Sequence, residues 1–79
     1  MNWIDDDCYC GFPTARVNGF AIVLCQDDDD VLSIQIFDEK DEDAMERGEM
    51  YDRISGFEDW DDMFSNAEYQ AFGLASIVR

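Results

Sequence analysis

The apolar and polar positions divide the chain into two parts, one with the period of β-strands and one with the period of α-helices. In the first part, Asn18-Gly19 separates residues 14–17 from the apolar run 20–24. This dipeptide is typical of a two-residue hairpin turn, whose central residues both need positive φ. We expect an antiparallel pair of strands here, with Pro13 at the start of an edge strand, because proline cannot donate a hydrogen bond to a neighbouring strand.

A third strand is predicted over residues 31–37, where apolar and polar side chains alternate. Leu32, Ile34 and Ile36 share one side and are predicted to face the core. The simplest arrangement of the three strands is an antiparallel meander, with the four aspartates at positions 27–30 in its second turn.

The second part of the chain predicts helices. Residues 39–53 are rich in helix formers, but Gly48 and a poor apolar stripe leave open either a short helix or an irregular acidic loop. A stronger apolar stripe follows, with the spacing of three and four residues that marks one face of an amphipathic helix. It consists of Phe57, Trp60, Phe64, Ala67 and Ala71.

Capping signals set the expected ends of this helix. Ser55 with Glu58 three residues later matches a capping box and predicts a helix that starts at Gly56. Gly73 is a natural stop for it. A second capping box begins at Ser65 and leaves open a break into two helices.

Residues 74–78 either end the last helix or return as a fourth strand, and the β-branched pair Ile77-Val78 favours the strand. Together these elements predict one acidic domain over residues 1–79. Its predicted fold class is α+β, a small three- or four-stranded antiparallel sheet with one or two carboxy-terminal amphipathic helices.

Charge changes this picture. The net charge is −15, and residues 27–62 hold sixteen carboxylates against three cations. So much like charge opposes compaction. The chain is nevertheless 47% apolar and 14% aromatic, unlike acidic chains that stay disordered. A core of this size contributes only about 3–5 kcal/mol of net stability, which leaves room for added stability from a partner or a homodimer.

The composition argues against several classes of protein. The longest apolar run, residues 20–25, suits a buried strand and is too short to cross a membrane. Anionic membranes and nucleic-acid phosphates both repel an acidic surface, so we expect no membrane binding and no direct binding of nucleic acid. Residues 5–7 are aspartates where a signal peptide needs cations, which predicts a cytoplasmic location.

Catalytic and metal-binding chemistry find little support. The chain has no histidine, and its glycines form no phosphate-binding pattern, so we expect neither an enzyme nor a cofactor. Cys8 and Cys10 are too close together for a zinc knuckle, and Cys25 is predicted to be a core residue. No run of acids matches the ligand spacing of an EF-hand loop. A calcium-responsive module therefore ranks third among the functional hypotheses.

The remaining use of the acids is recognition of a cationic surface. Duplex DNA carries one negative charge per about 1.7 Å of its axis, and proteins bind it with lysine and arginine. A rigid domain with carboxylates on one side can occupy such a basic groove in place of DNA.

Helical spacing adds to this hypothesis, because Glu58 would share an outward face with Asp61 and Asp62, while Glu42, Glu46 and Glu49 would line the weaker helix. The predicted partner-binding residues are the acids of the densest runs. They are Asp27, Asp28, Asp29, Asp30, Asp38, Glu39, Asp41, Glu42, Asp43, Glu46, Glu49, Glu58, Asp59, Asp61 and Asp62.

In size, charge and aromatic content the chain resembles the phage-encoded anti-CRISPR and anti-restriction proteins, several of which act as DNA mimics. It is similar in particular to the small inhibitors of type I systems, type I-C among them. The acidic centres that carry the resemblance are residues 27–30, 38–43 and 58–62. The resemblance implies binding to an effector complex in a bacterial host cell, whose access to target DNA would be blocked. It carries over no particular functional residue.

The sequence therefore predicts an inhibitor that competes with nucleic acid for a basic groove of a bacterial defence complex, without catalysis, metal or cofactor. The alternative is an acidic adaptor or regulatory subunit that docks on a basic protein unrelated to nucleic acid. Salt weakens both kinds of binding, so competition with DNA is the observation that distinguishes them.

Overall fold

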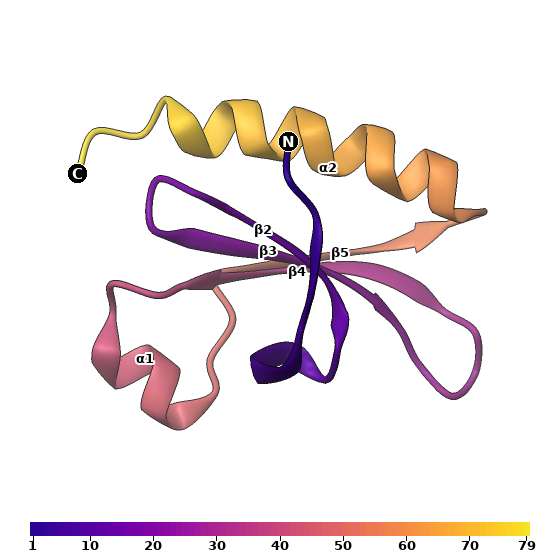
Figure 1. Cartoon of the computed structure of the whole chain (residues 1–79), viewed down its shortest axis with the longest axis horizontal. Helices are drawn as coiled ribbons and strands as arrows, with labels where there is room; N and C mark the ends of the chain where they lie inside the picture. Colours follow the sequence, from indigo (N-terminus) through magenta and orange to yellow (C-terminus); the bar gives the residue numbers. More distant parts are fainter.

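The computed structural model describes all residues, 1–79, and consists of an open five-stranded antiparallel sheet with a long helix across one face (Figure 1). Each strand pairs with the next one in the chain. The α+β class is confirmed, with five strands rather than three or four. The elements in chain order are β1 (Ile4–Asp6), the short 3-10 helix η1 (Asp7–Tyr9), β2 (Phe12–Val17), β3 (Phe20–Gln26), β4 (Leu32–Asp38), α1 (Glu42–Arg47), β5 (Asp52–Phe57) and α2 (Trp60–Ala75).

The predicted meander forms the centre of the sheet. Asn18 and Gly19 adopt φ values of 52° and 81°, as the two-residue hairpin turn between β2 and β3 requires. Leu32, Ile34 and Ile36 of β4 are at most 5% exposed and lie in the core. Residues 27–30 connect β3 to β4, as the alternation of the sequence predicts.

The prediction that Pro13 begins an edge strand is wrong, because β1 pairs along the outer side of β2 and places Asp5 opposite Pro13. Proline is tolerated there because the pairing of β2 with β3 starts only at Thr14. Strand β1 was not predicted, since Ile4 is the one apolar residue in its three.

The other edge of the sheet, β5, lies where the sequence predicted the end of a weak helix and the start of a strong one. Ile54 pairs with Ile34, and Phe57 pairs with Leu32, so both side chains lie on the helix-covered face. The register shifts between these pairs, at Gly56, whose φ of 94° fits a β-bulge with glycine at its special position. Because of the bulge, Ile54 and Phe57 lie three positions apart in the sequence and still face the same side of the strand.

Helix α2 begins at Trp60, not at Gly56. Its N-cap is Asp59, whose carboxylate accepts a 2.8 Å hydrogen bond from the backbone N–H of Asp62. The helix neither breaks near Ser65 nor stops at Gly73, but runs without interruption to Ala75.

The predicted fourth strand over residues 74–78 is wrong. Leu74 is 6% exposed, and its burial favours a helix that continues past Gly73. The side-chain amide of Asn18 then donates hydrogen bonds to the carbonyl oxygens of Leu74 and Ile77, at 3.0 and 2.9 Å. These bonds hold the last turn of the chain against the β2–β3 turn.

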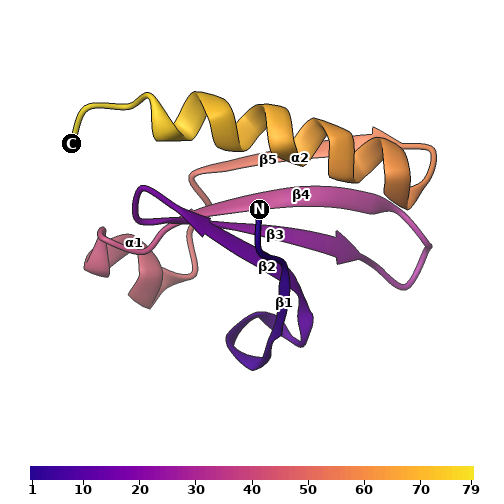
Figure 2. The same ribbon diagram turned by 45° about the horizontal axis from the view of Figure 1, so that its top comes forward.

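The core fills the space between α2 and one face of the sheet (Figure 2). Helix α2 contributes Met63, Ala67, Ala71 and Leu74, which pack on the apolar side chains of β3 and β4. Phe64 is only partly buried and packs edge-on against the ring of Trp3, with centroids 5.5 Å apart. None of the helices is long and apolar enough to span a membrane.

Candidate interaction surfaces

The fold separates the predicted partner-binding acids into two groups at opposite ends of the molecule. Residues 27–30 precede Leu32 and residues 58–62 follow Phe57, and because these two residues pair, both acidic runs lie at one end of the sheet. Residues 38–49 begin at the other end of β4, with its last residue Asp38, and include α1. The two groups appear at the right and left of Figure 1, along the 33 Å long axis of the molecule.

The side chain of Asp27 holds the backbone of the β3–β4 turn in place, and the other acids of the turn are exposed to solvent. Its carboxylate accepts hydrogen bonds from the backbone N–H groups of Asp29 and Val31, both at 2.9 Å. Asp30 completes the turn at a φ of 62° and accepts a bond from the side chain of Gln26. Asp28 and Asp29 are left exposed at the tip.

Two details of the predicted helical faces are wrong. Glu58 precedes the N-cap of α2, so it does not share a helical face with Asp61 and Asp62, although all three lie at the same end of the sheet. Helix α1 ends at Gly48, in the left-handed conformation, so Glu49 lies beyond it. Only Glu42, Asp43 and Glu46 are exposed acids of α1.

Seven of the fifteen predicted residues are engaged inside the protein. Asp27, Asp41 and Asp59 accept backbone hydrogen bonds at turns or helix starts, and Asp30 accepts one from a side chain. Asp38, Glu39 and Glu49 form ion pairs with Arg79, Arg16 and Arg47.

The other eight carboxylates are exposed and make no hydrogen bond or ion pair with the rest of the chain. We call five of them the turn-end acids: Asp28, Asp29, Glu58, Asp61 and Asp62. The remaining three are the α1 acids: Glu42, Asp43 and Glu46. These eight residues are free to meet a partner.

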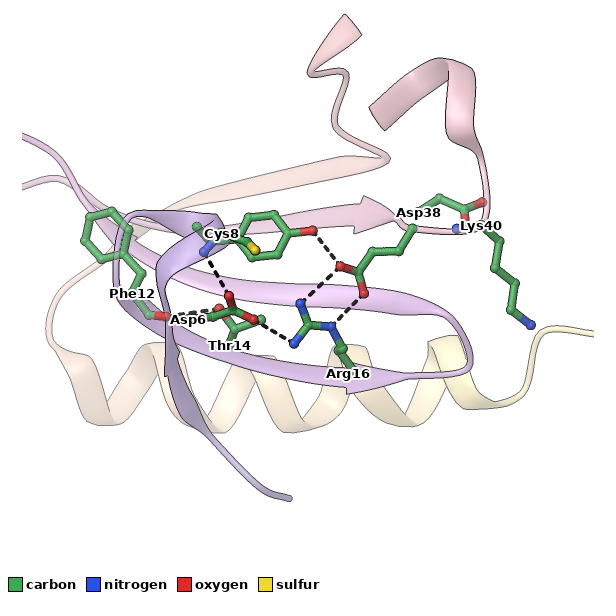
Figure 3. A network of polar contacts seen from close by, with 9 residues as sticks. Asp6, Cys8, Phe12, Thr14, Arg16, Asp38 and Lys40 are labelled. Carbon is green, nitrogen blue, oxygen red and sulfur yellow. Dashed lines mark hydrogen bonds and ion pairs between the residues drawn. The ribbon is translucent and has the colours of Figure 1, made fainter. Parts of the chain in front are cut away.

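The sequence did not predict the network around Arg16, which lies on the face of the sheet opposite α2 (Figure 3). The Arg16 guanidinium contacts Asp6 and Glu39, each at 2.7 Å, and the hydroxyl of Tyr9 donates a 2.9 Å hydrogen bond to Glu39. The network joins β1, η1, β2 and the end of β4, which are separated in the sequence. A signal for it was the presence of a single cation among the first 26 residues.

The pKa values in this network follow from its contacts. The backbone N–H of Cys8 and the guanidinium of Arg16 lower the pKa of Asp6. Burial and the bond to Glu39 raise the pKa of the Tyr9 phenol. Tyr9 and Asp6 therefore keep their ordinary neutral-pH charge states, and Glu39 is occupied as an acceptor.

A second ion pair fixes the carboxy-terminal residue. Arg79 contacts Asp38 at 2.6 Å, and its guanidinium lies 4.3 Å from the centre of the Phe20 ring. Burial raises the pKa of Asp38, but the hydrogen bonds from Arg79 and from the backbone N–H of Lys40 outweigh this effect, and the net shift is downward. Asp38 is therefore part of the fold rather than of a free surface.

The face of the sheet opposite α2 carries a pocket of about 530 Å³. Its floor is formed by side chains of β3 and β4, among them Val23, Gln35 and Phe37, and its walls by η1 and α1, with Tyr9 and Met45. Tyr9 packs on Phe37 with ring centroids 5.1 Å apart. Since residues 20–25 are apolar on both sides of β3, the sequence contained the signal that both faces are covered.

The three cysteines line this pocket, but they differ in exposure. Cys25 is 8% exposed, which confirms it as a core residue, and burial raises the pKa of its thiol to about 11. Cys8 and Cys10 are exposed. No group of three or more cysteine and carboxylate side chains is arranged to hold a metal ion.

The surface thus presents two groups of free carboxylates and one largely apolar pocket. Comparison of the chain with protein-family models, with curated proteins and with solved structures found no match.

Proposed function

We propose that the protein is an inhibitor that occupies a basic, nucleic-acid-binding groove of a bacterial defence complex in place of nucleic acid. The observation that carries this proposal is the set of eight free carboxylates, the turn-end acids and the α1 acids, at the two ends of the long axis. Each is exposed and unpaired in a chain that pairs three of its arginines with other acids.

The net charge of the protein is similar to that of the stretch of DNA it would replace. The molecule is 33 Å long and carries a net charge of −15. A stretch of duplex DNA of that length carries about 20 phosphate charges, at one per 1.7 Å of axis. A groove that binds duplex through lysine and arginine therefore meets a comparable charge over a comparable length.

The cost of keeping these acids unpaired supports the same proposal. Like charges repel one another within each group and oppose folding. A net charge of magnitude about 2–8 already suffices for solubility of a small domain. The excess is explained by a cationic partner, whose binding relieves the repulsion.

The resemblance to small inhibitors of type I systems names a candidate partner, the type I-C CRISPR effector complex. Long-range attraction between the acidic ends and the groove would speed association, and contacts within the groove would then exclude target DNA. Neither catalysis nor a cofactor enters this mechanism.

A gel-shift competition tests the proposal with purified effector complex and labelled target duplex. The variant Glu42→Gln/Asp43→Asn/Glu46→Gln removes the charge of the α1 acids. Three lost contacts of about 0.2–1 kcal/mol each should weaken inhibition by about 3- to 150-fold. The matched control Asp5→Asn/Asp7→Asn/Glu68→Gln removes the same charge from exposed acids outside both groups and should inhibit nearly as well as the wild type.

Two outcomes contradict the proposal. If the effector complex holds the protein and the duplex at the same time, the protein binds outside the DNA groove. If both triple variants lose inhibition equally, only net charge matters and no surface is specific. Tight binding to a basic protein without any competition with DNA favours the acidic adaptor.

A further inference from the structure

The pocket on the face of the sheet opposite α2 plays no part in the proposed electrostatic contact, yet it is built like a binding site. Its volume of about 530 Å³ lies in the range of pockets that receive compact ligands, about 300–1,000 Å³. Val23, Phe37 and Tyr9 give it an apolar interior, and Gln35 offers an amide at its floor. It therefore suits an apolar group with few polar atoms.

The lining of this pocket holds one charge of each sign, and further acids lie on the helix that forms one of its walls. Asp27 lines one side of the pocket, and α1, which contributes Met45 to the wall, carries the α1 acids on its exposed side. Arg53 is the one cation among the lining residues. An occupant consequently meets apolar surface and one charge of each sign in the pocket, and a net negative charge from the rest of the molecule.

We propose that the pocket receives an aromatic side chain from a lysine- or arginine-rich segment of the partner protein. The aromatic ring would pack between Tyr9 and Met45 above Val23, while the flanking cations approach the α1 acids on the helix that carries Met45. An anionic ligand would be repelled by the net charge of −15, and a neutral one would gain nothing from the α1 acids.

This inference rests on the proposed function, since it assigns the basic partner a second contact, but it adds a different role. Charged contacts at a rim govern mainly the rate of association and its salt dependence. A buried aromatic anchor in an apolar pocket governs mainly the rate of dissociation. The pocket would therefore select among basic surfaces, which the carboxylates alone cannot do.

The test is an NMR titration of the full chain with two synthetic peptides, Lys-Lys-Trp-Lys-Lys and Lys-Lys-Gly-Lys-Lys. The tryptophan peptide should bind about tenfold more tightly, from burial of the ring, and should shift the amide signals of Val23, Gln35 and Phe37. The glycine peptide should shift only signals of the acidic residues. N-acetyl-tryptophanamide, which has no cation, should bind the pocket more weakly than the tryptophan peptide.

Variants of residues inside and outside the pocket test whether the tryptophan ring binds there. Met45→Gln makes a wall of the pocket polar, and Gln35→Phe fills its floor; each should abolish the preference for tryptophan without changing binding of the glycine peptide. Met50→Gln is the control, because Met50 is 43% exposed and does not line the pocket. Melting curves of all three variants check that they fold.

Equal binding of the two peptides, with shifts confined to the acidic residues, would overturn the pocket proposal and leave the proposed function standing. Binding of N-acetyl-tryptophanamide as tight as that of the tryptophan peptide would show a site for neutral small molecules instead. If neither peptide binds, the inference fails together with the electrostatic basis of the proposed function.

Discussion

Three arginines form ion pairs with acids and so determine which carboxylates remain free. Arg16, Arg47 and Arg79 take Glu39, Glu49 and Asp38 out of the set of free carboxylates, and Arg16 takes Asp6 as well. Exposed ion pairs contribute little to stability in general, so their effect here is mainly to hold segments in place. Charge density in the sequence does not reveal which acids are paired, because the partners lie as many as 41 positions apart.

The three cysteines provide a prediction at the scale of single residues. Iodoacetamide at about pH 8 should modify Cys8 and Cys10 readily, because both are exposed. Cys25 should react far more slowly, because it is buried and its pKa is raised to about 11, so almost none of its thiol is ionised. Mass spectrometry of the native protein should find two labels.

Labelling in guanidinium serves as the control and should add the third label. Three labels at similar rates in the native protein would mean that β3 is not packed as described, or that the walls of the pocket open readily.

Side-chain direction could be predicted in the central strands, and side-chain pairing could not. Alternation placed Leu32, Ile34 and Ile36 in the core correctly, because period two leaves only one choice of face once the strand is known. The contacts of Tyr9, Arg16 and Glu39 depend on the path of the chain between strands, which periodicity does not determine.

At the scale of elements, β5 shows why a local pattern can mislead. The bulge at Gly56 returns Phe57 to the same face as Ile54, so a strand acquires the three-residue spacing of a helix. The capping box at Ser55 then suggested a helix start at Gly56, four residues before the observed first residue of α2, Trp60. Pairing with β4 outweighed both signals.

Asp59 carries a testable role in starting α2. Asp59→Ala should lower the free energy of unfolding by about 1 kcal/mol, since the N–H of Asp62 loses its acceptor. Asp59→Asn removes the same charge but keeps a good N-cap, and should stay within about 0.5 kcal/mol of the wild type. Urea unfolding followed by circular dichroism measures both.

An equal loss in the two variants would attribute the effect of Asp59 to its charge rather than to capping. No loss in either would place the start of α2 elsewhere than at Trp60.

For the whole molecule, charge repulsion predicts an unusual response to salt. The net charge of −15 opposes folding, and raising sodium chloride from about 0.01 M to about 0.15 M shortens the screening length from about 30 Å to about 8 Å. The melting temperature should therefore rise with salt. Differential scanning calorimetry over this range gives the measurement.

The variant Glu42→Gln/Asp43→Asn/Glu46→Gln should show a smaller rise, because it begins with less repulsion. A flat or falling melting temperature in the wild type would mean that the ion pairs of Arg16, Arg47 and Arg79 outweigh the repulsion among the free acids.

The candidate surface could be predicted at this scale only in part. Composition identified the acidic residues, but their division into two ends follows from the pairing of Leu32 with Phe57, which brings residues 27–30 and 58–62 together. The pocket depends on η1 and α1 lying over the same face of the sheet, and neither element has a strong signal in the sequence.

The order of the elements has a consequence during synthesis of the protein. The strands pair in chain order, and α2, which covers the apolar face of the sheet, leaves the ribosome only after all five strands. Until then the nascent chain exposes Ile22, Ile34 and their neighbours, the kind of surface through which unfinished chains aggregate. Most of the carboxylates in residues 27–62 emerge before α2 is complete, and they repel one unfinished chain from another. The charge that weakens the completed fold thus keeps its precursors dispersed.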